Sequence, residues 1–129
     1  MESKYNKIKS FTDIIAWKRG HKLVLIIYKQ TKKFPSQEKF GLTNQIRRCA
    51  VSITSNIAEA FGRKSYLEKS RFFSIALGSV YELQNQLLIA KDLGYISQKE
   101  FERTASLSIV VAKIINGLIK SSKKLDSKF

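Results

Sequence analysis

Two stretches of mixed small, polar and apolar residues decide the fold. Residues 45–63 read QIRRCAVSITSNIAEAFGR, and residues 73–83 read FSIALGSVYEL. In both, apolar residues recur at helical spacing, and small residues between them let two helix backbones approach closely. A polar group buried in such a contact needs a partner or costs about 1–3 kcal/mol. The polar and small residues therefore serve fold specificity, assembly or ligand contact; they are Ser52, Ser55, Asn56, Glu59, Gly78, Ser79 and Glu82.

Apolar periodicity around these stretches predicts four helices, at about residues 13–33, 38–61, 66–93 and 98–122. Asp13 is the expected N-cap of the first helix, and Pro35 ends that helix because the residue before a proline disfavours helical geometry. The first helix is expected to bury Ile14, Trp17, His21, Val24, Tyr28 and Thr31. The second is expected to bury Leu42, Ile46, Cys49, Ile53, Ile57 and Ala60. The fourth is expected to bury Phe101, Thr104, Ser108, Val111, Ile115 and Leu118.

Capping signals set the connections between the later helices. Ser65 with Glu68 and Ser97 with Glu100 have the spacing of capping boxes, and Gly94 is a natural residue just past a helix end. Short connections make neighbouring helices antiparallel, so we expect one domain over residues 1–129, an up-down-up-down four-helix bundle. Basic, flexible tails are expected at both ends, the second from Ser121 onward.

Composition is that of a globular protein. Of the 129 residues, 43% are hydrophobic, and there is one cysteine, which excludes an intrachain disulfide framework and fits a reducing cytosol. The longest apolar run, Leu23 to Tyr28, has six residues, far short of the ~20 that a membrane span needs. The N-terminus has no apolar export segment. We therefore expect a cytoplasmic protein without a membrane partner.

Charge is the strongest compositional signal. Lys and Arg number 24 against 10 Asp and Glu, for a formal net charge of +14. Such an excess favours a polyanionic partner, either nucleic acid or an anionic membrane surface. The alternative is a basic protein that binds nothing specific.

The basic residues of the first helix form one face. Lys18, Lys22, Lys29, Lys32 and Lys33 fall within roughly 100° at 3.6 residues per turn. Arg47 and Arg48 add forked donors that suit phosphate oxygens. Trp17 and Tyr28 are expected in the core rather than stacked on bases. The predicted nucleic-acid-binding residues are Lys18, Arg19, Lys22, Lys29, Lys32, Lys33, Arg47, Arg48, Arg63 and Lys64.

A second predicted set is a polar network between helices two and three. It comprises Asn56, Glu59, Arg63, Ser79 and Glu82, with Arg63 as the cation for one carboxylate. We assign it a structural or interface role rather than ligand contact or catalysis. No cofactor or metal site is predicted, because di-iron bundles need Glu-x-x-His pairs from two helices and the chain has one histidine. His21 is expected to be packed with a bonded ring nitrogen, and Cys49 to be a buried, inert thiol.

The first and third helices are apolar over most of their circumference. Leu23 and Ile27 lie away from Trp17 and Tyr28 on the first helix, and the third leaves little room for a solvent face. A helix that is apolar all round is buried all round, so subunit contacts are expected. The chain is therefore predicted to be a homo-oligomer.

The ordered set of motifs resembles a known family: the bacterial four-helix-bundle proteins encoded within intervening sequences of 23S ribosomal RNA genes, with the accessory variability determinant of diversity-generating retroelements in the same group. The resemblance covers nearly the whole chain. Where the family commonly has glycine after the motif glutamate, this chain has Ala60. The resemblance implies a basic homopentameric barrel that binds nucleic acid without known catalysis. The residues that carry it are Asp13–Trp17, Tyr28, Phe34–Pro35, Phe40–Leu42, Gln45–Arg48, Ser52–Ile53, Asn56–Glu59, Arg63, Ile75–Ala76, Gly78–Ser79, Glu82 and Leu93–Tyr95.

Two classes of function remain from the sequence. The first is a non-catalytic, nucleic-acid-binding oligomer with low sequence specificity, such as an RNA chaperone or an accessory subunit of a reverse transcriptase. The second is an oligomeric protein adaptor whose charge serves solubility or an acidic protein partner. A metal-dependent nuclease using Glu59 and Glu82 is a weaker third alternative.

Overall fold

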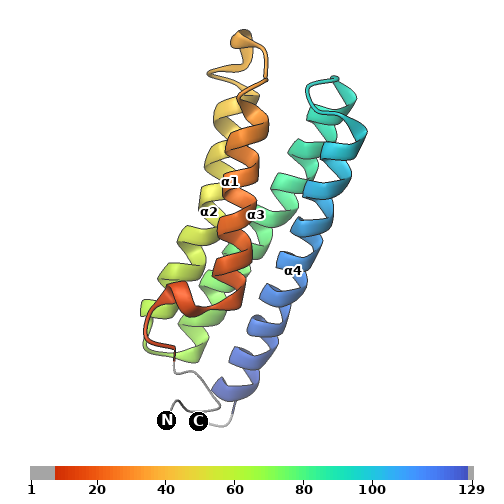
Figure 1. Ribbon diagram of the computed structural model, residues 1–129. Coiled ribbons are helices and arrows are strands. Elements are labelled where there is room, and N and C mark those ends of the chain that lie inside the picture. The colour runs from red at the N-terminus through yellow and green to blue at the C-terminus, as the bar shows by residue number, and fades with distance from the viewer. Residues whose placement is uncertain (1–7, 128–129) are drawn as a thin grey trace, which may run out of the picture.

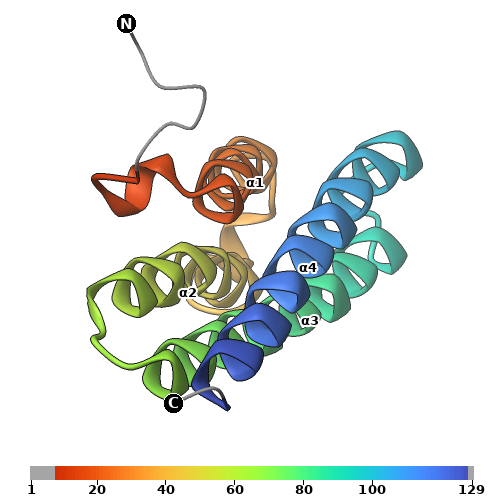
Figure 2. The ribbon, with the colours of Figure 1, turned by 90° about the horizontal axis from the view of Figure 1, so that it is seen from below.

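Four long helices form the protein in the computed structural model, which describes residues 8–127 (Figure 1). α1 spans Ile15–Thr31, α2 Leu42–Gly62, α3 Tyr66–Asp92 and α4 Gln98–Asp126; the short 3-10 helices η1 (Phe11–Asp13) and η2 (Ser36–Glu38) precede α1 and α2. The helices alternate in direction, and each packs against two neighbours around a common centre (Figure 2). The predicted all-α, up-down-up-down four-helix bundle is confirmed.

The core lies along the bundle axis and is mainly aliphatic, with some buried polar side chains such as Thr104 and Ser108. Its fully buried side chains come from all four helices and interlock at helical spacing. The largest are Leu23, Ile27, Ile46, Ile53, Ile57, Val80, Leu83, Leu87, Val111 and Ile115.

The predicted seam of α1 is wrong in its interior. Tyr28 and His21 are exposed and Trp17 is only half-buried, whereas Leu23 and Ile27 are buried within the single chain. The cause is a close approach at Gly20, where a Cβ atom would lie 3.1 Å from Thr54 Cγ2 of α2. That contact turns the α1 face of small and aliphatic residues inward and moves the aromatic residues to its edge; the buried positions are Ala16, Gly20, Leu23, Ile27, Gln30 and Thr31.

The start of α1 also differs from the expectation. Asp13 is not the N-cap: its carboxylate accepts hydrogen bonds from the backbone N–H of Lys9 (2.9 Å) and Ser10 (3.1 Å) and completes a capping box for η1. The N-cap of α1 is Ile14, which has no polar side chain to offer. A capped 3-10 turn therefore leads into the helix.

α2 begins later than predicted. Residues 36–38 form η2, and Gly41, the N-cap of α2, has non-helical backbone geometry immediately before Leu42. The Glu38 carboxylate accepts a hydrogen bond from the Leu42 N–H at 3.2 Å, so it caps the helix from outside. The resulting turn leaves Phe40 86% exposed.

The later helix ends follow the predicted caps. Ser97 and Glu100 form a complete capping box, and Gly94 has φ +80°, the left-handed geometry that favours glycine past a helix end. At Ser65 only half of the box forms, with its hydroxyl accepting from the Glu68 N–H at 3.1 Å.

The predicted tail from Ser121 is wrong over most of its length. α4 continues to Asp126 because Ser122 is buried and Leu125 half-buried, which extends the packed stripe. Residues 128–129 of that tail and residues 1–7 of the predicted N-terminal tail lie outside the described residues.

α4 is the one described helix long and apolar enough to cross a membrane, with an 18-residue window of mean hydropathy 1.3. In the bundle that helix packs against α1 and α3 and buries hydroxyl groups, including those of Thr104 and Ser108. The arrangement is that of a bundle helix.

The two connections at one end of the bundle are tied together. The Tyr95 hydroxyl, from the α3–α4 connection, donates a 2.8 Å hydrogen bond to the Glu38 carboxylate of η2. The Tyr95 ring also packs against Phe34, with centroids 5.3 Å apart. This contact braces the end of the bundle where α1 finishes and α4 begins.

Candidate nucleic-acid interface

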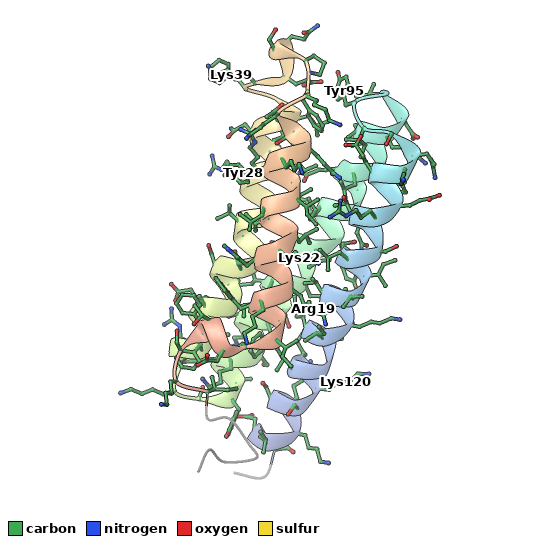
Figure 3. All side chains as sticks on the ribbon, in the orientation of Figure 1. Arg19, Lys22, Tyr28, Lys39, Tyr95 and Lys120 are labelled. Atoms are coloured by element: carbon green, nitrogen blue, oxygen red, sulfur yellow. The ribbon has the colours of Figure 1, made fainter. Side chains whose placement is uncertain are left out.

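Most predicted basic residues of α1 lie on the side of the helix that is turned from α2. Lys18, Lys22 and Lys29 are exposed and fall close together on the helix, and Arg19 and Lys22 project from α1 on the side that borders α4 (Figure 3). Lys33, one turn beyond Lys29, continues the row. Lys32, also exposed, is turned farther from α4 by the helical period.

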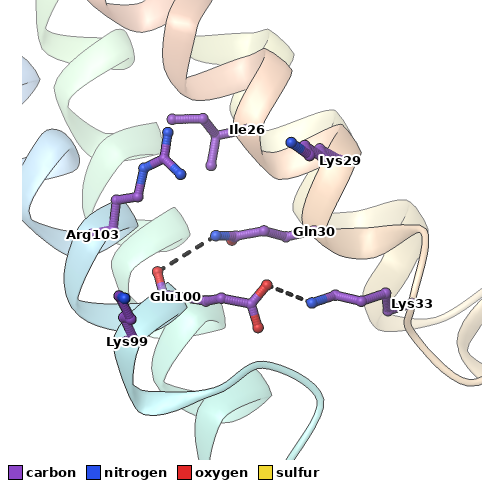
Figure 4. Close-up of a pocket in the computed structure, with 7 residues that line it drawn as sticks. All are labelled: Ile26, Lys29, Gln30, Lys33, Lys99, Glu100 and Arg103. Atoms are coloured by element: carbon purple, nitrogen blue, oxygen red, sulfur yellow. Dashed lines mark hydrogen bonds and ion pairs between the residues drawn. The ribbon is translucent and has the colours of Figure 1, made fainter.

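α4 supplies two cations that the sequence analysis missed. Lys99 and Arg103 lie on its first turns and face the last turns of α1 across a cleft of about 390 Å³ (Figure 4). We call this the α1/α4 cleft; its lining residues are Ile26, Lys29, Gln30, Lys33, Lys99, Glu100 and Arg103. Their place could have been predicted from the antiparallel topology, which brings the start of the fourth helix beside the end of the first.

Hydrogen bonds between the two helices close the floor of the cleft. The buried Gln30 amide donates to the Thr104 hydroxyl at 2.8 Å and to the Glu100 carbonyl at 3.4 Å. Lys33 pairs with the Glu100 carboxylate. That ion pair, followed by the Ser97 N–H, holds the pKa of Glu100 below its usual value, so the carboxylate is charged at neutral pH.

Few of the basic groups are neutralised. Among residues 8–127 there are three ion pairs: Lys33–Glu100, Arg63–Glu59 and Lys91–Asp92. The remaining cations of α1 and of the cleft have no such partner in the described part of the chain. We define the α1/α4 basic face as Lys18, Arg19, Lys22, Lys29, Lys33, Lys99 and Arg103.

The arginines of α2 do not join this face. Arg47 is half-buried on the opposite side of α1, where its Nε donates to the Thr31 hydroxyl at 2.7 Å and its guanidinium lies 4.8 Å from the Tyr28 ring. Arg48 is exposed beside α3, in a shallow pocket that Glu82 also lines. Tyr28, predicted to be core, is therefore an exposed platform for Arg47.

Arg63 and Lys64 lie at the other end of the bundle, where α2 turns into α3. Arg63 pairs with Glu59 at 2.9 Å and stacks over the Phe72 ring at 4.5 Å. The side chains of Arg63 and Lys64 are both exposed. The ten predicted residues therefore occupy four regions of the chain's surface rather than one.

The predicted polar network divides into separate groups. The hydroxyls of Ser79 (α3) and Ser52 (α2) form a 2.9 Å hydrogen bond, and the Asn56 amide donates to the Ser52 hydroxyl at 3.2 Å. Glu82 instead accepts from Gln86 on its own helix at 3.3 Å. Glu59 and Arg63 form an exposed pair, so the two carboxylates have different partners.

The reactive residue types are placed unfavourably for chemistry. Cys49 is buried, and its thiol donates to the Ser79 carbonyl at 3.0 Å. Burial, with a smaller effect from the Glu82 carboxylate, raises the pKa of Cys49 to about 12. His21 is exposed rather than packed, and its ring stacks on Trp17 with centroids 4.6 Å apart. Within residues 8–127, no three His, Cys, Asp or Glu side chains are grouped for a metal ion.

The fold and these surfaces define a basic, all-α bundle protein. The sequence profile of the 23S rRNA-intervening sequence protein family matches residues 12–117. The chain belongs to this family, as the resemblance in its motifs predicted.

A solved structure from Bacteroides thetaiotaomicron has the same fold. It is described as a protein with unknown function from the S23 ribosomal protein family, and it superposes with a TM-score of 0.77 at 24% identity. The alignment covers 82% of this chain and 99% of the other. The comparison with curated proteins found no significant match.

Proposed function

We propose that the protein is a non-catalytic, oligomeric nucleic-acid-binding protein that contacts RNA or DNA through phosphates. The α1/α4 basic face carries the proposal, because two helices place unpaired cations side by side on it. Lysine and arginine side chains in such a row match the spacing of a polyanion better than that of a single carboxylate partner. Membership of a family defined by 23S rRNA intervening sequences supports an RNA ligand.

Low sequence specificity follows from the shape of the surface. Base edges are read by a helix or ribbon that enters a groove, whereas phosphate contacts position a protein without reading sequence. The cations of the basic face lie along the sides of packed helices, and the exposed Tyr28 ring of α1 is covered by Arg47. We therefore expect similar affinity for unrelated sequences.

Assembly into a homo-oligomer is the second part of the proposal. The outer side of α3 exposes large apolar side chains that the protomer leaves uncovered, and such a patch favours a protein interface. We propose five subunits on the strength of the family resemblance. The exposed large apolar residues of α3 are Tyr66, Leu67, Ile75, Tyr81, Leu88 and Ile89, and Leu93 follows at its C-cap.

Assembly also gives the remaining predicted residues a role. Arg48 and Glu82 lie where the outer surfaces of α2 and α3 meet, and Arg63 and Lys64 lie at the turn between these helices. We propose that they contact a neighbouring subunit or add phosphate contacts between subunits. The proposed location is the cytoplasm.

An adaptor function is the alternative, favoured by the same apolar side of α3. There the partner would be another protein, such as a reverse transcriptase, and nucleic acid would not bind the basic face. A nuclease using Glu59 and Glu82 is less well supported, because Arg63 engages one carboxylate and Gln86 the other.

Fluorescence anisotropy with unrelated RNA and DNA oligomers across a salt series tests the proposal. Log affinity should fall with log salt by about 0.9 per phosphate contact on duplex DNA and about 0.7 on single strands. Lys22→Glu and Arg103→Glu should weaken binding to every sequence and flatten this slope. The matched control is Lys120→Glu, which makes the same charge reversal at an exposed residue about 25 Å along α4 from Arg103. Absence of binding at low salt would reject this function in favour of the adaptor.

A further inference from the structure

The α1/α4 cleft differs from the rest of the basic face because its cations line the two sides of one cleft. Four of its lining residues are basic and one, Glu100, is acidic, and Lys33 alone pairs with that carboxylate. Lys29, Lys99 and Arg103 are left without an ion-pair partner among residues 8–127. A concave site with an excess of cations concentrates anions more strongly than a flat row of the same charges.

The walls of the cleft come from two elements that the fold holds in register. Figure 4 shows Arg103 and Lys99 projecting from α4, with Lys29 of α1 and Lys33, just past the end of α1, opposite them. Gln30 spans the floor with its bonds to Glu100 and Thr104, which fixes the separation of the helices. The site is therefore set by packing and does not depend on side-chain charges alone.

The size and lining of the cleft indicate a ligand larger than a bare anion. Its volume of about 390 Å³ lies in the range of small-molecule sites. Ile26 forms an apolar part of the wall, next to the Arg103 guanidinium in Figure 4. The guanidinium fork binds phosphate oxygens in pairs, and the separate ammonium groups suit the remaining charge of a dianion.

We infer that the α1/α4 cleft binds a phosphate monoester of nucleotide size, with Arg103, Lys99 and Lys29 contacting the phosphate. The group is carried either by a free mononucleotide or by the phosphorylated end of a strand. A backbone phosphodiester has one charge and is flanked by sugars on both sides, so it fits a cleft lined by cations on two sides less well. Binding at this site does not require the long electrostatic contact proposed for the basic face.

Glu100 limits the affinity of the site. Its carboxylate holds Lys33 and places one negative charge at the edge of the cleft. Glu100→Gln removes that charge and releases Lys33 toward the ligand, while glutamine still offers an oxygen to the Ser97 N–H. A residue that only stabilised the helix would not strengthen ligand binding when changed in this way.

Isothermal titration with AMP, adenosine and inorganic phosphate tests the inference on the full chain. AMP should bind and adenosine should not. Arg103→Gln and Lys99→Gln should each weaken AMP binding by about tenfold or more, the effect of losing a charge-assisted hydrogen bond. Glu100→Gln should tighten it several-fold. Lys120→Gln, the same loss of charge elsewhere on α4, should leave it unchanged, and melting temperatures verify that each variant is folded.

RNA oligomers with and without a 5′-phosphate distinguish the two sources of the ligand. Tighter binding of the phosphorylated oligomer, lost in Arg103→Gln, assigns the cleft to a strand end. If AMP binds and the protein binds both oligomers with equal affinity, the cleft is assigned to a free nucleotide. The inference is overturned if AMP does not bind, or if Lys120→Gln weakens it as much as Arg103→Gln. In either case the salt-dependent binding of longer RNA by the basic face is tested separately, by the anisotropy salt series.

Discussion

At the scale of the residue, small side chains decide where large ones lie. Gly20 lets α1 approach α2 until a Cβ atom would crowd the Thr54 methyl group, and this contact sets the rotation of α1. On the other side of α2, Cys49 and Ser52 both bond to Ser79, through its carbonyl and its hydroxyl. Cys49 and Ser52 of α2 thus each have a partner on the facing helix α3, which limits the register between these two helices.

Cys49 should be chemically silent in the folded protein. Its thiol has a pKa of about 12 because burial disfavours the thiolate, against 9.0 for an ordinary cysteine. Alkylation by iodoacetamide at pH 8 should therefore be much slower in buffer than in guanidinium, where the chain is unfolded. Equal rates in the two solutions would contradict the buried thiol.

The same shift affects stability at high pH. Below pH 9.0 the thiol is neutral in both states and has no effect. Between that value and about 12 the unfolded thiol ionises and the folded one does not, so the free energy of unfolding falls as pH rises. Cys49→Ala should lessen this alkaline loss.

At the scale of the element, caps fix the helix ends that matter for the cleft. Ser97 and Glu100 satisfy each other's backbone N–H groups at the start of α4, and this box also positions Glu100 toward Lys33. Gly94 makes the left-handed turn immediately before it. Local chemistry at one connection therefore places one wall of the cleft.

Ser97→Ala should lower the free energy of unfolding by about 0.5–2 kcal/mol, because the Glu100 N–H loses its partner. Ser106→Ala, an exposed change in the interior of the same helix, is the matched control and should be nearly neutral. Urea denaturation measures both. A loss no larger than that of the control would show that the cap has little role.

The sequence predicts the helices better than their rotations. Caps such as Gly94 and the Ser97 box act within a few residues, so the pattern alone reveals them. The inward face of α1 depends on the contact between Gly20 and Thr54. The apolar pattern of α1 is equally consistent with a buried face that contains Trp17 and Tyr28, so the pattern alone could not predict the observed rotation. In the candidate site, the α1 lysines follow from helical period, but Lys99 and Arg103 join them only through packing. Arg47 and Arg63 lie elsewhere, over the rings of Tyr28 and Phe72 on neighbouring helices.

At the scale of the whole molecule, the protomer has two unlike surfaces. The first and last helices present the basic face, and α3 presents exposed apolar side chains such as Ile75, Tyr81 and Leu93. α1 and α3 lie diagonally opposite each other in the bundle (Figure 2), so an assembly through the outer side of α3 leaves the basic face available. Repeating that face around a ring would multiply weak phosphate contacts by effective concentration.

Sedimentation equilibrium at micromolar concentration should give a mass several times the 14.8 kDa of the chain, with five subunits as the proposed number. Tyr81→Glu, which places a charge on the apolar side of α3, should shift the mass toward the monomer. Lys120→Glu provides a charged control away from that surface. A wild-type mass of one chain would contradict the assembly.

Lysine protection tests the binding surface most directly. The protein is treated with an amine-reactive reagent with and without a single-stranded RNA, and mass spectrometry gives the modification rate of each lysine. We expect RNA to protect Lys18, Lys22, Lys29, Lys33 and Lys99, and to leave Lys39 and Lys120 as reactive as in the free protein. Equal protection of all these lysines, or protection confined to Lys39 and Lys120, would contradict the α1/α4 basic face as the nucleic-acid interface.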